Sequence, residues 1–354
     1  MYTIYDVASE AGVSTATVSR VLSGKANVRN ATKERVLAAI EKLDFHPNII
    51  GQALNRGAGM AILMIVPLTS TPVLSSCIRA VAEKLKETPY KLLMGYYESG
   101  SSNVLEPQRD LIGSDLIRGI IFLDTNGTIP SFNKPTVVIS EQPSCPYPYC
   151  VVSNDRKAVS IMTESLINRG VSRFAYIGMS NKAVRKETDY STERFKGVTD
   201  ALEGHGLQFD KQNYYECVYT SECSDDYYIY TAAAKAAEKI ALLPESRRPE
   251  AVICATDVIA YACLDVFKRH GLKVPEDIRV AGYDNSSLSM IASPQITTIQ
   301  SPFGEFGTEA SRLLISILES GSTGQDNTQN KADTHDAVRI TIDPSVCFRE
   351  STGR

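Results

Sequence analysis

The first 23 residues contain two short amphipathic helical patterns separated by a glycine. Apolar residues at helical spacing mark one face of each pattern: Ile4, Val7, Ala8 and Ala11 in the first, and Val13, Val18, Val21 and Leu22 in the second. Gly12 breaks the pattern, and Ser14 can open the second helix. The spacing therefore predicts a helix-turn-helix, a motif whose second helix enters the major groove of DNA.

The second helix leaves one face free. This face carries small or hydrogen-bonding side chains, namely Thr15, Ala16, Thr17, Ser19 and Arg20. An arginine guanidinium can bind guanine through two hydrogen bonds, so the face suits the major groove. An ordinary helical hairpin with a solvated, hydroxyl-rich face would show the same pattern.

A third amphipathic pattern closes an all-α headpiece of three helices. We expect Thr32 to cap it, and its apolar positions are Val36, Leu37, Ile40 and Leu43. The helix must end before Pro47. Residues 47–56 are compatible with a short helix that would be marginal alone in water. We therefore predict a headpiece at 1–46 and a hinge helix with linker at 47–59.

Residues 3–56 resemble the DNA-binding region of the lactose/galactose repressor (LacI/GalR) family, through the pattern D-V-A-x-x-A-G-V-S-x-x-T-V-S-R-V-L. The resemblance implies a homodimeric regulator that binds double-stranded, near-palindromic operator DNA and represses genes for carbohydrate use. It implies base contacts from Thr15, Ala16, Arg20 and Leu54, with Leu54 as a wedge in the minor groove. It implies phosphate contacts from Thr3, Ser14, Thr17, Ser19, Ser23, Asn27 and Thr32.

From about residue 60, short apolar strands alternate with helical patterns, which predicts parallel sheets with helices on both faces. Residues 251–285 and 293–299 extend the family resemblance. It implies a body at 60–354, similar to a periplasmic binding protein, with two doubly wound α/β lobes that bind the effector and dimerise. We expect an N-lobe at about 60–157 and 300–322, and a C-lobe at about 158–290 and 330–352. Ligands of such folds bind at the carboxyl ends of the strands.

The resemblance places the effector-binding arginine at Arg194 and its paired carboxylate at Asp284. Further candidates for the effector site are strand-end or wall residues: Asp257, Thr256, Asp124, Leu74, Tyr219, Asn154 and Asp155. Asp257 precedes a helical pattern, so capping of that helix is an equal alternative. The usual Asp-Asn pair of the family is reversed as Asn154-Asp155, and Ser301 replaces its usual glutamine. We expect a sugar effector that differs from the common ones.

Composition excludes several other classes of protein. The 354 residues contain no apolar run long enough to span a bilayer and no signal peptide, so we expect a cytoplasmic protein without a membrane partner. The eight cysteines form no C-x-x-C pair and the four histidines are scattered, so we expect reduced thiols, no metal and no cofactor. No catalytic motif is present, which argues against an enzyme. The alternative function is a sugar-binding module that acts through a protein partner without specific DNA binding.

Overall fold

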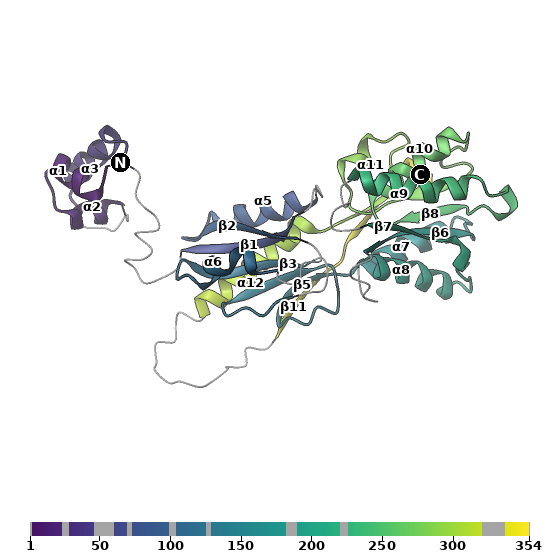
Figure 1. Ribbon diagram of the computed structural model, residues 1–354, viewed down its shortest axis with the longest axis horizontal. Helices are drawn as coiled ribbons and strands as arrows, with labels where there is room; N and C mark the ends of the chain where they lie inside the picture. Colours follow the sequence, from purple (N-terminus) through teal and green to yellow (C-terminus); the bar gives the residue numbers. More distant parts are fainter. Residues whose placement is uncertain are drawn as a thin grey trace. The chain divides into compact units, whose positions relative to one another are not determined.

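The computed structural model describes residues 2–22, 28–45, 60–68, 73–98, 104–124, 129–181, 190–219, 226–320 and 337–353. The chain divides into two compact units, Met1–Gly59 and Met60–Arg354. The first is helical, and the second contains the β-sheets (Figure 1).

The first unit is a bundle of three helices, α1 (Ile4–Ala11), α2 (Thr15–Leu22) and α3 (Asn30–Lys42). Gly12 ends α1 with φ 60°, in the left-handed region that glycine adopts without strain. The small core consists of Val7, Ala8, Ala11, Val18, Val36, Ala39 and Phe45. The helical periodicity of the sequence thus gives the three predicted helices and the side of each that is buried.

Two details of α3 differ from the prediction. The helix begins at Asn30 with Arg29 as its cap residue, so the expectation that Thr32 caps it is wrong. Leu37, expected in the core, is 48% exposed. Val36 is buried as expected, Ile40 and Leu43 pack against the core, and Ala39 is buried as well.

The second unit contains a six-stranded parallel sheet with the order β11-β5-β4-β3-β1-β2. Its strands are β1 (Ala61–Pro67), β2 (Lys91–Tyr97), β3 (Ile117–Asp124), β4 (Thr136–Ser140), β5 (Tyr149–Ser153) and β11 (Val338–Ile342). Both faces are covered, because alternate residues of β1 join two different core clusters. Helices α5 (Val73–Leu85) and α12 (Phe303–Ser320) cover one face, and η1 (Glu106–Gln108) and α6 (Arg109–Gly113) lie over the other.

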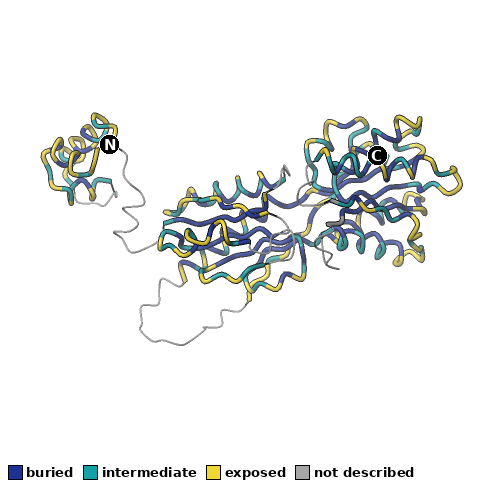
Figure 2. The backbone as a smooth tube through the Cα atoms, in the orientation of Figure 1, coloured by how far each residue is buried: buried dark blue, intermediate teal, exposed yellow. Residues whose placement is uncertain are grey.

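A second parallel sheet has the order β7-β6-β8-β9 and forms the centre of the C-lobe. Its strands are β6 (Phe174–Asn181), β7 (Tyr214–Tyr219), β8 (Ala251–Cys254) and β9 (Arg279–Ala281). The helices of this lobe are α7 (Asp155–Ile167), α8 (Tyr190–Gly204), α9 (Asp226–Ala241), α10 (Asp257–Arg269) and α11 (Ser287–Ile291). Helix α7 packs on α8, and α9 packs on α10. Figure 2 shows that the buried residues follow both sheets.

The chain passes between the lobes three times: from β5 into α7, from β10 (Thr298–Gln300) into α12, and from β11 into β12 (Ser345–Cys347). The prediction that residues 330–352 belong to the C-lobe is wrong for β11. This strand pairs in parallel with β5, and its Ile340 and Ile342 pack on the N-lobe core. The segment returns to the C-lobe with β12, which pairs antiparallel with β10.

Seven of the cysteines lie in the described part of the chain, and all seven are free thiols. Six of them are buried, and Cys347 is partly exposed. Among the helices that the structure describes, none combines the length and the apolar character that crossing a bilayer requires.

Candidate functional site

In the first unit, one side of α2 is anchored and the other is open to solvent. Val18 is fully buried, whereas Ala16, Ser19 and Arg20 are exposed and Thr15 is half-buried. Three of the predicted base-contacting residues, Thr15, Ala16 and Arg20, therefore lie on the solvent-accessible side of α2. Leu54, the fourth predicted base contact, lies outside the described residues.

The start of α2 is held by side chains that were predicted to contact phosphates. The Thr17 backbone N–H donates to Ser14 Oγ at 3.3 Å, and Ser14 Oγ lies 3.0 Å from Thr17 Oγ1. These bonds satisfy donors at the helix N-terminus, which otherwise lack partners. Both residues therefore have a structural role, and their hydroxyl groups lie at an N-terminus, where anions bind favourably.

The start of α1 has a capping box. Thr3 donates from its backbone N and from its Oγ1 to Asp6 Oδ2, each at 2.7 Å. Hydrogen bonds from Thr3 lower the pKa of Asp6 from its usual value. Thr3 is exposed and Thr32 is half-buried. Two other predicted phosphate contacts, Ser23 and Asn27, lie outside the described residues.

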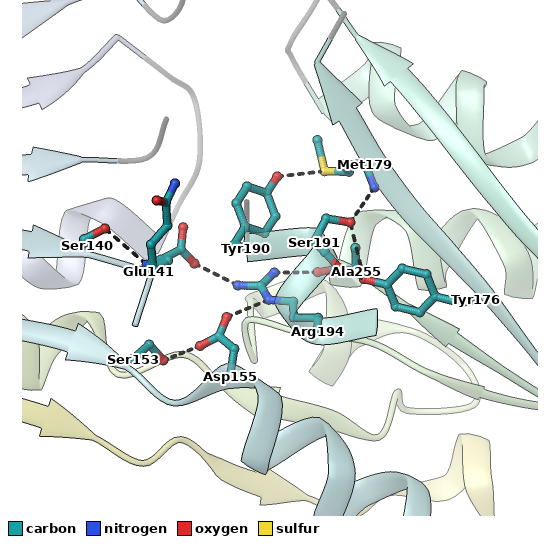
Figure 3. A network of polar contacts seen from close by, with 11 residues as sticks. Ser140, Glu141, Ser153, Asp155, Tyr176, Met179, Tyr190, Ser191, Arg194 and Ala255 are labelled. Atoms are coloured by element: carbon teal, nitrogen blue, oxygen red, sulfur yellow. Dashed lines mark hydrogen bonds and ion pairs between the residues drawn. The ribbon is translucent and has the colours of Figure 1, made fainter. Parts of the chain in front are cut away.

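In the second unit, Arg194 is the centre of a buried polar network (Figure 3). It lies on the buried face of α8 with Ser191, Gly197 and Val198, and only 2% of its side chain is exposed. A Cβ atom at Gly197 would clash with the carbonyl oxygen of Arg156, so this glycine lets α8 approach α7 closely. The close packing of α8 on α7 therefore buries the Arg194 guanidinium inside the body.

All three nitrogens of the Arg194 guanidinium donate to protein oxygens. Nε donates to Asp155 Oδ2 at 2.8 Å, Nη1 to the Ala255 carbonyl at 2.7 Å, and Nη2 to Glu141 Oε1 at 2.7 Å. Asp155 and Ala255 belong to the C-lobe, whereas Glu141 follows β4 of the N-lobe. The Arg194–Glu141 ion pair therefore joins the two lobes.

Two aromatic rings contact the same guanidinium. The Arg194 Cζ atom lies 3.5 Å from the ring centroid of Tyr283 and 4.6 Å from that of Tyr190. Cation–π contacts of this kind are stronger where water is excluded. Tyr190 and Tyr283 thus stabilise the buried positive charge of Arg194.

The carboxylates around Arg194 outnumber it, and burial makes their ionisation costly. Burial raises the pKa of Glu141 to about 7, assisted by Asp155 and Asp124 and opposed by Arg194. Burial and neighbouring carboxylates also raise the pKa of Asp284 well above its ordinary range. The structure thus brings Arg194, Asp155 and Asp284 together as one electrostatic unit.

Asp257 binds the loop that follows Asp284. Its Oδ2 accepts from the Ser286 backbone N at 2.7 Å and from Ser286 Oγ at 2.9 Å, and its Oδ1 accepts from Thr298 Oγ1 at 2.6 Å. Burial raises the pKa of Asp257 to about 6, opposed by these hydrogen bonds. Thr256, and not Asp257, caps α10 by accepting from the Ile259 N–H. Asp257 therefore positions the loop that carries Asp284, which has φ 111°.

Of the remaining predicted effector residues, Asp124 lies near the Arg194 cluster, where it helps to raise the pKa of Glu141. Asp124 is buried and accepts from Ser140 Oγ at 3.3 Å. Leu74 is 8% exposed and packs in the core of the N-lobe, and Asn154 donates to Asp343. The side chain of Tyr219 lies outside the described part of the structure.

Glu141 was not predicted as a site residue. A signal existed, because an acidic residue follows the apolar strand 136–139, as Asp124 follows the strand 119–123. Its partner Arg194 is 53 positions away in the sequence, so no local pattern could pair them.

Comparisons with known proteins agree with these two units. Residues 3–48 match the model of the lacI family of bacterial regulatory proteins, and residues 163–352 match a periplasmic binding protein-like domain. The chain is 31% identical to the transcriptional repressor CytR of Escherichia coli K12 over 330 residues, 91% of each chain. Two solved structures share the fold. One is a CelR–cellobiose complex (TM-score 0.67, 24% identity, 99% of this chain and 100% of that chain). The other is a lac repressor dimer bound to operator and the anti-inducer ONPF (TM-score 0.78, 19% identity, 99% of each chain).

The family match at the helix-turn-helix, the second match over the body and the near-full-length similarity to a repressor point to one conclusion. The chain belongs to the lacI family of bacterial regulatory proteins and is a transcriptional regulator that binds DNA.

Proposed function

We propose that this protein represses transcription by placing α2 in the major groove of an operator. The observation that carries the proposal is the open face of α2, where Ala16, Ser19 and Arg20 are exposed while Val18 anchors the helix in the core. Arg20 reads a base, and the hydroxyls of Ser14 and Thr17 contact phosphate. If Ala16, Ser19 and Arg20 were buried, α2 could not bind in the major groove.

The operator is a near-palindrome bound by a homodimer. One headpiece of this size reads only a few base pairs, and paired half-sites about one helical turn apart provide the rest of the specificity. The lac repressor of similar fold is a dimer on its operator. We assign the headpiece to residues 1–46 and the hinge to 47–59, with Leu54 as the minor-groove wedge. A protein of this kind acts by binding DNA and its effector and not by catalysis. It works in the cytoplasm, where the chromosome lies.

The effector is a sugar bound at the Arg194 cluster. Arg194, Asp155 and Asp284 offer donors and acceptors for hydroxyl groups, and the half-buried ring of Tyr190 can cover the face of a sugar. The CelR structure of similar fold is a complex with cellobiose.

The switch acts through the relation between the lobes. Arg194 and Glu141 belong to different lobes, so a ligand that binds Arg194 has different contacts when the lobes separate. Only such a difference in affinity between two states can shift their equilibrium. A change in lobe angle then alters the spacing of the two hinges of a dimer, and with it their folding on DNA.

The experiment compares two charge-matched variants of the headpiece. Operator sequences are first selected from random DNA with the full-length protein, and binding is then measured by fluorescence anisotropy. Arg20→Ala should lose about 5- to 150-fold in affinity for the selected DNA, since a bidentate base contact is worth about 1–3 kcal/mol. Lys42→Ala removes the same charge from α3, where Lys42 pairs with Glu10, and should bind almost as the wild type does.

Equal affinity of the wild type for selected and scrambled DNA would overturn the proposal. That result would favour the sugar-binding module that acts through a protein partner. A normal operator affinity in Arg20→Ala would remove Arg20 from the base contacts.

A further inference from the structure

The guanidinium of Arg194 is already bound by an anion of the protein itself. Its Nη2 atom donates to Glu141 at 2.7 Å, and the Glu141 side chain is 13% exposed. Arginine binds carboxylate and phosphate groups of ligands through the same N–H groups. The edge of Arg194 that an anionic ligand would need is therefore occupied.

The surrounding charges oppose a second anion. Asp155 contacts the same guanidinium at 2.8 Å, and Asp284 and Asp124 contribute further negative potential at Glu141 or Arg194. In a buried setting each added negative charge raises the cost of the others, because solvent screens them poorly. A ligand phosphate or carboxylate would increase this repulsion.

Neutral hydrogen-bonding groups remain available at the same place. Tyr283 is 1% exposed, and its Oη atom lies near the Asp155 carboxylate without a well-formed hydrogen bond to any residue that the structure describes. Its ring contacts Arg194. A buried hydroxyl without a partner costs free energy that a ligand hydroxyl can recover.

We propose that Glu141 determines the class of the effector: it acts as an internal anion on Arg194, so the site accepts polyhydroxylated ligands without negative charge and rejects sugar phosphates and sugar acids. The inference rests on the proposed effector site and deepens it. Glu141 reaches Arg194 from the opposite lobe, so the ion pair also holds the lobes together before any ligand binds.

The test is chemical rescue of the full-length protein. Glu141→Ala removes the carboxylate, and acetate can take its place beside Arg194. In sodium acetate the unfolding temperature of this variant should rise by a few degrees above its value in sodium chloride of equal ionic strength. The wild type should show no such difference. Glu83→Ala, which breaks an exposed ion pair with Lys86 in the same lobe, should show none either.

The outcomes separate the proposals. If acetate and chloride act alike on Glu141→Ala, or if acetate stabilises the wild type equally, the internal anion is excluded. If Glu141→Ala does not fold in chloride, recovery of its circular dichroism in acetate supports the proposal, and no recovery opposes it. Glu141→Gln fills the same volume and should not respond to acetate.

A ligand panel tests the class directly. Glucose, glucosamine, glucuronate and glucose 6-phosphate are compared by thermal shift on the wild type. Stabilisation by either anionic member that is lost in Arg194→Lys would overturn the inference. Failure of every sugar would count against the proposed sugar effector, while the acetate experiment would still decide the role of Glu141.

Discussion

Asn154 and Asp343 connect two of the three crossovers between the lobes. Asn154 Nδ2 donates to Asp343 Oδ1 at 2.9 Å, and the Lys157 ammonium contacts the other carboxylate oxygen at 2.5 Å. Asn154 lies where β5 passes into α7, and Asp343 lies where β11 passes into β12. The contact therefore ties two of the three connecting segments to each other.

Asp343→Ala should change lobe motion more than stability. Asp343 and its partner Lys157 are each about half exposed, and exposed ion pairs contribute only about 0–1 kcal/mol. We expect a small change in the urea midpoint but faster hydrogen exchange of the Asn154 N–H, which donates to the Ile342 carbonyl. Glu83→Ala is the control. Unchanged exchange in Asp343→Ala would show that the contact does not restrain the crossovers.

Gly197→Ala should destabilise the body because the added Cβ would clash with the Arg156 carbonyl of α7. Forcing extra volume into a packed contact costs about 1–3 kcal/mol. Gly204→Ala is a matched control in the same helix, since no atom lies within 4 Å of its added Cβ. Urea denaturation should show a lower midpoint for Gly197→Ala and an equal or higher one for Gly204→Ala. The prediction fails if the two variants unfold alike.

Asp257→Ala should release the loop that holds Asp284. The substitution leaves Thr298 Oγ1 and both donors of Ser286 without their acceptor, and each buried unsatisfied group costs about 1–3 kcal/mol. We expect a large loss in the free energy of unfolding and loss of any effector response. Thr256→Ala removes only the α10 cap, at a cost of about 1 kcal/mol. Equal losses in the two variants would contradict this assignment.

The stability of the body should depend on pH through Glu141. Its pKa is raised to about 7 in the folded protein from an ordinary 4.5, so the folded state binds more protons between these values. Stability conferred by this group is therefore greatest at low pH and falls as pH rises towards 7. Burial is the main cause of this raised pKa; Arg194 opposes it, and the facing carboxylates of Asp155 and Asp124 add to it. Asp257, with a pKa of about 6, acts in the same direction.

Glu141→Gln isolates the Glu141 contribution, since the amide does not titrate. The difference in unfolding free energy between Glu141→Gln and wild type should grow in favour of the variant between pH 5 and 7.5, a window that spans the raised pKa of about 7. Urea titrations at several pH values measure it. A constant difference across this range would mean that Glu141 ionises normally.

The sequence predicts well what depends on local periodicity. The buried and open faces of α2 follow from Val18 and Arg20 alone, because a helix repeats every 3.6 residues. Both predicted sheet faces of β1 are buried, as its continuous apolar run indicates. The fold class is confirmed by the family matches.

Features set by long-range pairing were harder to predict. The strand at 338–342 was recognised, but its partner β5 lies nearly 190 residues earlier, and the strand pattern does not say which sheet it joins. Glu141 and Arg194 are likewise distant in the sequence, at 53 positions apart. The family resemblance located Arg194 but carried no information about Glu141.

The three crossovers have a consequence for biosynthesis. During translation, α12 and β11 leave the ribosome only after the whole C-lobe sheet has been made. The N-lobe must therefore wait with the outer edge of β5 unpaired, and with the core face beneath α12 uncovered, while its neighbour folds. Deletion of the last 20 residues would thus leave an N-lobe that lacks its edge strand, even though most of that lobe lies in the first half of the chain.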